Sequence, residues 1–340
     1  MAEDLWAVAD LVTPMAIRVA ATLRLADHID AGRKSDTGTA SVDDLATATG
    51  TDPDALRRLM DHLVTAGVLT PGWELTALGE QLRDDHPGRA RAWLDMDGAV
   101  GHAELSFVEL LHSVRTGEPA FPRRYGVPYW DDLAAHPGRS ASFDALMGSR
   151  LTADAPAIAG GYPWGALGHV VDVGGGSGDL LIAILSAHAG LRGTVVDLPG
   201  PVARAEQAFA AAGLGERAGV RAGSFFDPLP AGAGGYILSG VVHDWDDERA
   251  TTILRRCAEA SGTATAGGES PDGGKVLVVD TFGIEHTAGD LRMLCYVGGR
   301  ERTLDELTEL AATAGLRCCS TRPAGSRLIV EFTADPPGPL

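Results

Sequence analysis

The sequence has little positive charge. Among its 340 residues, 28 are Lys or Arg and 46 are Asp or Glu, which leaves a formal net charge of −18 at pH 7. Proteins that hold nucleic acids or anionic membranes through phosphate groups depend on clustered basic residues. We therefore expect neither a nucleic-acid partner nor a membrane partner. With 45% apolar residues, the chain has enough hydrophobic side chains for a packed core, which excludes a disordered protein.

Cysteines are few and long apolar runs are absent. The four cysteines occur without a CxxC pair or histidine-rich spacing, so the sequence predicts no metal site and no redox motif. No apolar stretch approaches the roughly 18 residues that a membrane-spanning helix needs. The N-terminus also lacks the basic start and apolar centre of a signal peptide. These absences predict a soluble cytoplasmic protein with reduced thiols.

The first hundred residues have the apolar spacing of helices. Ser41-Val-Asp-Asp44 has the form of a capping box with Asp in place of Glu, and Thr51-Asp-Pro-Asp54 places a proline just inside another helix. A Pro71-Gly72 turn then predicts a small hairpin over 68–76. Helices followed by a two-stranded wing outline a winged helix. Because aspartates offset the arginines of its last helix, we expect a packing or dimerisation role, and a transcription regulator is the alternative from another functional class.

The pattern changes near residue 168, where short apolar strands begin to alternate with helices. This alternation indicates βαβ units and a parallel sheet, an α/β fold of the Rossmann-like type. Residues 90–165 are expected to be mainly helical, and 261–274 have the composition of a polar loop. The expected strands are 170–173, 194–198, 220–222, 236–238 and 276–279, and the expected helices are 180–185, 201–212 and 247–260.

A glycine cluster, Asp172-Val-Gly174-Gly-Gly176-Ser-Gly178, lies at the first strand-to-helix turn. Glycines there let the backbone approach a ligand, and Asp197 at the end of the next strand is placed to accept both hydroxyls of a ribose. A dinucleotide motif would have glycine where this chain has Asp179. Asp172 would repel a pyrophosphate, whereas it suits a ligand with ammonium and sulfonium charges. The cluster therefore favours S-adenosylmethionine over a nicotinamide cofactor, which is kept as a remote alternative.

His243 follows another strand, within Leu238-Ser-Gly-Val-Val-His243-Asp-Trp245. Open α/β sheets bind ligands at the carboxyl ends of their strands, so a histidine placed there is a candidate general base. The aromatic pair Phe225 and Phe226 follows a neighbouring strand, and its rings are expected to sandwich a purine.

The chain resembles the small-molecule S-adenosylmethionine-dependent O-methyltransferases of the caffeate, hydroxyindole and anthracycline type. The resemblance covers nearly the whole chain, and it is strongest to the bacterial branch that modifies polyketides. The segments that match the family are Val171–Gly178, Phe225–Pro230, His243–Asp246, Arg255–Ala258, Gly274–Asp280 and Gly298–Thr303. The segments that match the bacterial branch in particular are Ala9–Met15, Arg24–His28, Gly79–His86, Gly232–Tyr236 and Asp290–Leu294.

This resemblance implies both an activity and a domain organisation. The expected reaction methylates a hydroxyl of an aromatic polyketide-type molecule in antibiotic biosynthesis, and a hydroxylated naphthoic acid is the favoured substrate. The other product is S-adenosylhomocysteine. Residues 1–99 would form a helical, winged-helix-like dimerisation domain of a homodimer. Residues 100–340 would form substrate-covering helices and a Rossmann-like methyltransferase domain. An S-adenosylmethionine-binding decarboxylase or hydroxylase of the anthracycline-tailoring type is the alternative within the same fold.

The resemblance also implies roles for individual residues. His243 would be the base, oriented by Asp280, where plant relatives have a longer glutamate, and by Glu301. Ser224 stands where relatives often bind adenine with an acid. No metal is needed. The expected cofactor-binding residues are Asp172, Gly174, Gly176, Asp197, Leu198, Ser224, Phe225, Phe226, Ser239 and Trp245. The candidate substrate-binding residues are Trp93, Met96, Phe107, Phe143, Met147, Arg292 and Tyr296.

Overall fold

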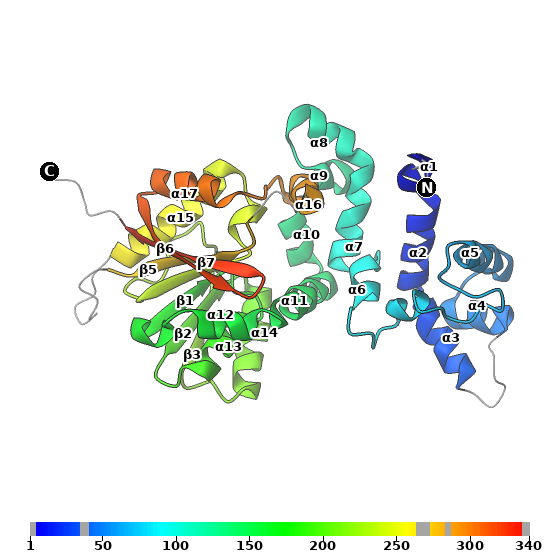
Figure 1. Ribbon diagram of the computed structural model, residues 1–340, viewed down its shortest axis with the longest axis horizontal. Helices are drawn as coiled ribbons and strands as arrows, with labels where there is room; N and C mark the ends of the chain where they lie inside the picture. The colour runs from blue at the N-terminus through cyan, green and yellow to red at the C-terminus, as the bar shows by residue number, and fades with distance from the viewer. Residues whose placement is uncertain (1–4, 35–40, 263–272, 283–286, 335–340) are drawn as a thin grey trace. The chain divides into compact units, whose positions relative to one another are not determined.

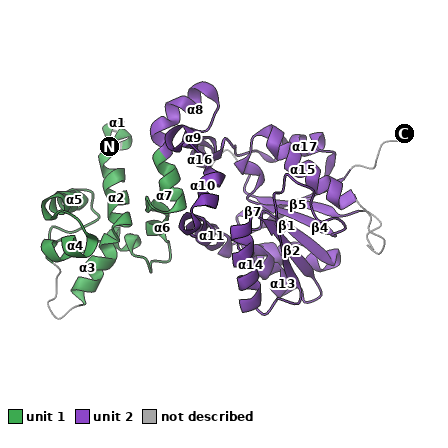
Figure 2. Ribbon diagram, turned by 180° about the vertical axis from the view of Figure 1, so that it is seen from behind, with its two compact units in different colours: residues 1–105 green, residues 106–340 purple. Residues whose placement is uncertain are grey.

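The computed structural model describes residues 5–34, 41–262, 273–282 and 287–334. The chain forms two compact units, residues 1–105 and residues 106–340 (Figures 1 and 2). The boundary expected at residue 99 falls on the first residue of helix α7 (Ala99–Glu104), which belongs to the first unit. The expected loop over 261–274 lies mostly outside the described residues.

The first unit is helical and has its own core, in which Leu25, Met60 and Leu63 are fully buried. The two predicted helix starts are confirmed. The Ser41 hydroxyl accepts the Asp44 N–H while the Asp44 carboxylate accepts the Ser41 N–H, and Asp52 caps the helix that begins at Pro53. Its helices are α1 (Leu5–Ala9), α2 (Val12–Thr22), α3 (Leu25–Arg33), α4 (Val42–Thr49), α5 (Pro53–Thr65), η1 (Gly79–Leu82), α6 (Ala90–Leu94) and α7.

The expected hairpin over 68–76 is reduced to one isolated antiparallel bridge, between Leu69 and Leu75. The turn is tight, with Trp73 in the left-handed region at φ 59°. Backbone N–H groups of Thr70 and Thr76 donate to the carbonyls of Glu74 and Val68 across the two arms, and the Thr76 hydroxyl donates to the carbonyls of Gly67 and Val68. The wing is therefore a short hairpin, with less pairing than a regular two-stranded ribbon.

The second unit begins with short helices and continues into the predicted alternation of strands and helices. The short helices confirm the expectation for residues 90–165. The helical elements are η2 (Leu105–Glu109), α8 (Leu110–Thr116), α9 (Ala120–Tyr125), α10 (Tyr129–Ala135), α11 (Pro137–Thr152), α12 (Ala155–Gly161), η3 (Trp164–Leu167), α13 (Asp179–Ala187), α14 (Pro199–Ala211), η4 (Val242–Asp244), α15 (Asp247–Gly262), α16 (Thr287–Val297) and α17 (Leu304–Thr313).

The sheet of the second unit is mixed and has the strand order β3-β2-β1-β4-β5-β7-β6. The five expected strands pair in parallel, which confirms the predicted βαβ arrangement, and β7 adds an antiparallel strand that pairs with both β5 and β6. The last two strands were not predicted, because β6 is polar, contains Pro323 and has a bulge after Cys318. The strands are β1 (His169–Val173), β2 (Arg192–Asp197), β3 (Ala218–Ala222), β4 (Gly235–Ser239), β5 (Lys275–Asp280), β6 (Leu316–Ala324) and β7 (Arg327–Ala334).

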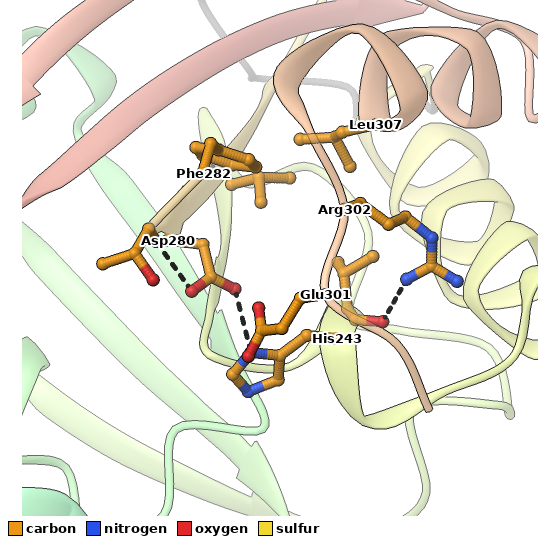
Figure 3. Close-up of a pocket in the computed structure, with 9 residues that line it drawn as sticks. His243, Asp280, Phe282, Glu301, Arg302 and Leu307 are labelled. Carbon is orange, nitrogen blue, oxygen red and sulfur yellow. Dashed lines mark hydrogen bonds and ion pairs between the residues drawn. The ribbon is translucent and has the colours of Figure 1, made fainter. Parts of the chain in front are cut away.

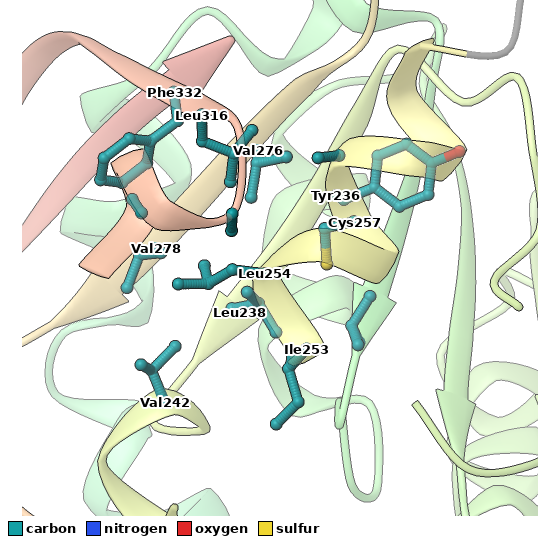
Figure 4. Packing of buried hydrophobic residues seen from close by; sticks show 14 of the residues in the cluster. Tyr236, Leu238, Val242, Ile253, Leu254, Cys257, Val276, Val278, Leu316 and Phe332 are labelled. Atoms are coloured by element: carbon teal, nitrogen blue, oxygen red, sulfur yellow. The ribbon is translucent and has the colours of Figure 1, made fainter. Parts of the chain in front are cut away.

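Helices cover both faces of this sheet, with α12, α13 and α14 on one face and α15 and α17 on the other (Figure 1). Successive strand residues point to opposite faces. Thus Leu238 and Val278 pack against Leu254 of α15 (Figure 4), whereas Ile237 and Leu277 belong to the core on the opposite face. Because the central strands are buried on both faces, functional side chains are left to the loops at the strand ends.

Candidate active site

The glycine loop connects β1 to α13 and lies at the carboxyl edge of the sheet. Gly174, Gly176 and Gly178 all have positive φ, at 72°, 56° and 83°. A Cβ at Gly178 would lie 2.7 Å from the ring of Phe209, and one at Gly174 would lie 2.8 Å from Val241. Glycine is therefore required both for the backbone conformation and for the close packing of the loop.

Two carboxylates lie at this loop. Asp197 accepts the N–H of Gly176 at 2.8 Å and the N–H of Leu198 at 2.7 Å, so it fixes the loop to the end of β2. Asp172 lies beneath the loop, is only 1% exposed, and its Oδ2 has no hydrogen-bond partner among the described residues. Burial and the charge of Asp197 raise the pKa of Asp172 to about 7. A buried carboxylate with an unpartnered oxygen fits a ligand that brings positive charge, such as S-adenosylmethionine.

The expected adenine-binding residues form an aromatic cluster. Phe225 and Phe226 contact each other, with ring centroids 5.2 Å apart and planes tilted by 58°, and Phe226 lies edge-on to Trp245 at 4.9 Å. Because these two rings contact each other directly, the structure shows no slot between them that would hold a purine. Ser224 accepts the N–H of Phe226 at 3.2 Å. Of the other expected cofactor residues, Leu198 is 40% exposed at the start of α14, and Ser239 ends β4.

The candidate base His243 lies in η4, just beyond β4, and carboxylates surround its imidazole (Figure 3). Its Nδ1 lies 3.4 Å from Glu301 and 3.7 Å from Asp280, and its Nε2 lies 3.6 Å from Asp244. The structure therefore brings together the three residues that the sequence predicted for catalysis. Asp280, the shorter carboxylate, ends 3.7 Å from Nδ1, beyond ordinary hydrogen-bond distance.

A small cavity of about 10 Å³ lies beside the imidazole, roughly the space of one water molecule. It is lined by Val242, His243, Val278, Asp280, Thr281, Phe282, Glu301, Arg302 and Leu307 (Figure 3). The side chains of His243, Glu301 and Asp280 are 21%, 17% and 9% exposed, so they are partly removed from solvent, which strengthens their electrostatic interaction relative to a surface site.

The charges at this site control two pKa values. Burial lowers the pKa of His243, but the charges of Asp280, Asp244 and Glu301 outweigh burial and raise it to about 10. Burial raises the pKa of Asp244 to about 7, despite the opposing charge of His243. Asp244 had been assigned no role from the sequence, although it directly follows the candidate base.

Three of the expected substrate residues lie in a chain of aromatic contacts in the second unit. Tyr129 and Trp130, which link this chain, were not predicted from the sequence. The signal was present as four aromatic residues between positions 121 and 130. The ring centroids of the pairs Phe107–Tyr296, Tyr129–Tyr296, Tyr129–Phe143, Trp130–Phe143 and Trp130–Trp245 lie between 5.5 and 6.3 Å apart.

The other expected substrate residues lie elsewhere. Met147 is half-buried on α11, and Arg292 is exposed on α16. Trp93 and Met96 are half-buried in the first unit, so they are not part of the aromatic chain of the second. The described residues contain no cluster of three or more His, Cys, Asp or Glu side chains able to hold a metal ion. No described helix is long and apolar enough to cross a membrane.

Comparison with known families assigns both parts of the chain. Residues 107–317 match an O-methyltransferase domain, and residues 6–83 match an O-methyltransferase dimerisation domain. The chain belongs to the O-methyltransferase family. The expected fold is thereby confirmed, a class I methyltransferase domain with an N-terminal helical dimerisation domain. The expected S-adenosylmethionine-dependent O-methyltransferase activity is confirmed as well.

This O-methyltransferase is 56% identical to a 2,7-dihydroxy-5-methyl-1-naphthoate 7-O-methyltransferase of Streptomyces carzinostaticus, over 96% of both chains. It is 47% identical to an aclacinomycin 10-hydroxylase of Streptomyces purpurascens, over 96% of this chain and 88% of the relative. Among solved structures, it resembles an O-methyltransferase from neocarzinostatin biosynthesis in complex with S-adenosylmethionine and 2-hydroxy-5-methyl naphthoic acid. That likeness has a TM-score of 0.90 and 54% identity, and covers 97% of this chain and 98% of the other.

Proposed function

We propose that this O-methyltransferase methylates a hydroxyl of a hydroxylated naphthoic acid in antibiotic biosynthesis, with His243 as the general base. The observation that carries the base assignment is the imidazole at the carboxyl edge of the sheet, with Glu301 and Asp280 at its Nδ1. The substrate class rests on the 56% identity to a dihydroxynaphthoate methyltransferase and on the naphthoic acid bound in the similar solved structure.

The cofactor-binding role of the glycine loop rests on its close backbone packing and its two acids. Asp172 would face positive charge on the donor, and Asp197 would accept ribose hydroxyls while it holds Gly176. Phe225, Phe226 and Trp245 would provide an aromatic wall instead of a sandwich. Bound S-adenosylmethionine supplies an electrophilic methyl group on a sulfonium sulfur. Gly174, Leu198, Ser224 and Ser239 complete the proposed cofactor site.

His243 would take the proton of the substrate hydroxyl as the oxygen begins to react. A naphthol, like other phenols, has a pKa near 10. The pKa of His243, about 10, is matched to that value, so the proton transfer is nearly balanced. Glu301 and Asp280 would stabilise the imidazolium that forms and fix the orientation of the ring. The base must be neutral before it reacts, so the rate is expected to rise with pH above the ordinary histidine value.

The aromatic chain of the second unit would bind the flat substrate. Tyr129 joins Phe143 to Tyr296, which contacts Phe107, and Trp130 extends the chain to Trp245, a member of the proposed aromatic wall. Such rings favour edge-to-face and offset contacts with a naphthalene ring system. Arg292 is the candidate partner of the substrate carboxylate. Met147 on α11 is a further candidate for substrate contact.

A second candidate function is hydroxylation, favoured by the 47% identity to an aclacinomycin 10-hydroxylase. The two reactions differ in their products. We expect incubation with methyl-labelled S-adenosylmethionine and a hydroxynaphthoic acid to give a product that carries the label in a methoxy group, as read by mass spectrometry. A product that gains an oxygen atom and no labelled methyl group would overturn the proposal in favour of the hydroxylase.

We also propose that the protein is a homodimer in the cytoplasm. The match to a dimerisation domain supports the dimer, as does the exposure of large apolar side chains on α1 and α2 and between them. These side chains are Leu5, Trp6, Val8, Leu11, Val12 and Met15. The four free cysteines support a reducing compartment.

A further inference from the structure

Arg302 is a buried cation that the proposed mechanism does not use. Its side chain is 4% exposed, and it lies directly after Glu301 in the chain. Burial of a guanidinium is costly unless its donors are satisfied. Its carboxylate partner, Asp247 at the start of α15, is itself 58% exposed. A partly exposed carboxylate alone does not offset the cost of burying Arg302, so the other hydrogen bonds of its guanidinium must contribute.

The guanidinium of Arg302 bridges the turn that carries the base. One terminal nitrogen donates to the carbonyl of Val242 at 2.9 Å, and the other donates to the carbonyl of Trp245 at 2.9 Å. These two carbonyls lie on either side of His243 and Asp244 in the chain. The same guanidinium donates to Asp247 at 2.8 and 3.2 Å, so the turn is also tied to α15. Figure 3 shows Arg302 beside Glu301 at this turn.

The backbone before Arg302 packs closely on the same turn. A Cβ at Gly299 would lie 2.2 Å from the carbonyl oxygen of His243, so the chain passes here without room for a side chain. The N–H of Glu301 is accepted by Asp290 of α16 at 2.8 Å, which fixes the direction of the segment. Glu301 and Arg302 are consecutive, so one packed and hydrogen-bonded segment carries both the carboxylate at Nδ1 and the guanidinium that contacts the flanking carbonyls.

We infer that Arg302 is a positioning residue for methyl transfer, which holds the turn of His243 at a fixed distance from Glu301 and Asp280. This inference rests on the proposed function of His243 as the base. Only a planar, multiply donating cation spans two carbonyls and a carboxylate at once; a lysine ammonium reaches fewer of them. Without Arg302, the imidazole moves relative to its acids, and a misplacement of about 1 Å costs on the order of 100-fold in rate.

The test compares Arg302→Met with Arg300→Met. Arg300 also pairs with Asp247, at 3.4 Å, but its side chain is 49% exposed, so its loss serves as the matched control. We expect Arg302→Met to lower kcat by roughly 100-fold. We expect the KM for a hydroxynaphthoic acid and the Kd for S-adenosylhomocysteine to stay within about threefold of wild type. Arg302→Lys, which keeps the buried charge, should recover part of kcat.

The pH profile separates positioning from mere structural support. Asp280, Glu301 and Asp244 are the charged groups that face His243 and raise its pKa. If the imidazole moves away from these acids, its pKa falls. The pH at which kcat declines on the acid side then shifts to a lower value in Arg302→Met and stays unchanged in Arg300→Met. An Arg302→Met variant that keeps the wild-type pH profile overturns the inference whether or not its kcat falls, as does an equal loss of kcat in Arg300→Met.

If Arg302→Met does not bind S-adenosylhomocysteine, Arg302→Lys takes its place, and a wild-type kcat and pH profile in that variant overturns the inference. Failure of the proposed function has a different signature, because His243→Asn would then keep wild-type turnover. If His243→Asn is inactive while the Arg302 variants behave as wild type, only the positioning role is refuted.

Discussion

We predict that the Asp172 carboxylate lowers the folding stability of the cofactor-free protein and strengthens cofactor binding. The carboxylate is 1% exposed, and its Oδ2 has no partner among the described residues. Burial and Asp197 raise its pKa from 3.8 to about 7, so the folded protein favours the protonated form. As pH rises from about 4 to 7, the unfolded chain ionises freely while the folded protein does not. Stability is therefore lost over this range, and the full cost is present above pH 7.

The size of this effect follows from the two pKa values. A carboxyl with pKa 3.8 in the unfolded chain and about 7 in the folded protein costs about 3 kcal/mol more at pH 8.5 than at pH 5. Asp172→Asn removes this pH-dependent cost, and any cost of burying the amide is the same at both pH values. For a unit of this size, about 3 kcal/mol corresponds to roughly 6–12 °C in Tm.

The assay is thermal unfolding of wild type and Asp172→Asn at pH 5 and pH 8.5. We expect the Tm of the variant, relative to wild type, to be higher at pH 8.5 than at pH 5 by about 6–12 °C. Calorimetry should show about 10- to 100-fold weaker binding of S-adenosylmethionine, because a buried charge–charge contact is lost. Asp179→Asn, with the same charge change at an exposed position of the same motif, is the control. The reasoning is refuted if the difference in Tm does not change with pH, or if Asp179→Asn shows the same change.

Three further predictions concern the base, the loop and the dimer. Glu301→Gln removes one of the charges that raise the pKa of His243, so the acid limb of the kcat/KM profile should move to lower pH; an unmoved limb contradicts the electrostatic account. Gly178→Ala introduces a Cβ 2.7 Å from Phe209 at a φ of 83°, and should lower Tm by several degrees and weaken S-adenosylhomocysteine binding in calorimetry. Trp6→Asp, on the exposed apolar side of α1, should shift the mass measured by light scattering from dimer toward monomer; an unchanged mass removes α1 from the proposed interface.

Features encoded in short segments were predictable from the sequence. The capping box at Ser41 and the helix start at Pro53 depend on residues three apart, and both appear as expected. The glycine loop and His243 also follow from local signals, namely a strand, a turn and the residue types within it. The glycine loop and His243 lie at the same edge of the sheet because parallel βαβ units bring the carboxyl ends of their strands together.

Features that depend on tertiary contacts were not predictable in the same way. The antiparallel strand β7 and its partner β6 follow the last helix, and nothing in the polar sequence of β6 indicates that β7 enters the sheet beside β5. Arg302 belongs to a recognised motif, but its bonds to Val242 and Trp245 join segments some sixty residues apart. The contact between Phe225 and Phe226, and the edge-on contact of Phe226 with Trp245, are tertiary features that a sequence pattern does not report.

The central claim is that His243 removes the proton of the hydroxyl that receives the methyl group. The most direct test is the rate of transfer of a labelled methyl group from S-adenosylmethionine to a hydroxynaphthoic acid, measured for wild type and His243→Asn at saturating concentrations of both. We predict a loss of at least about 100-fold in kcat for the variant, with the Kd for S-adenosylmethionine within about threefold of wild type. A variant that transfers the methyl group at the wild-type rate would contradict the account.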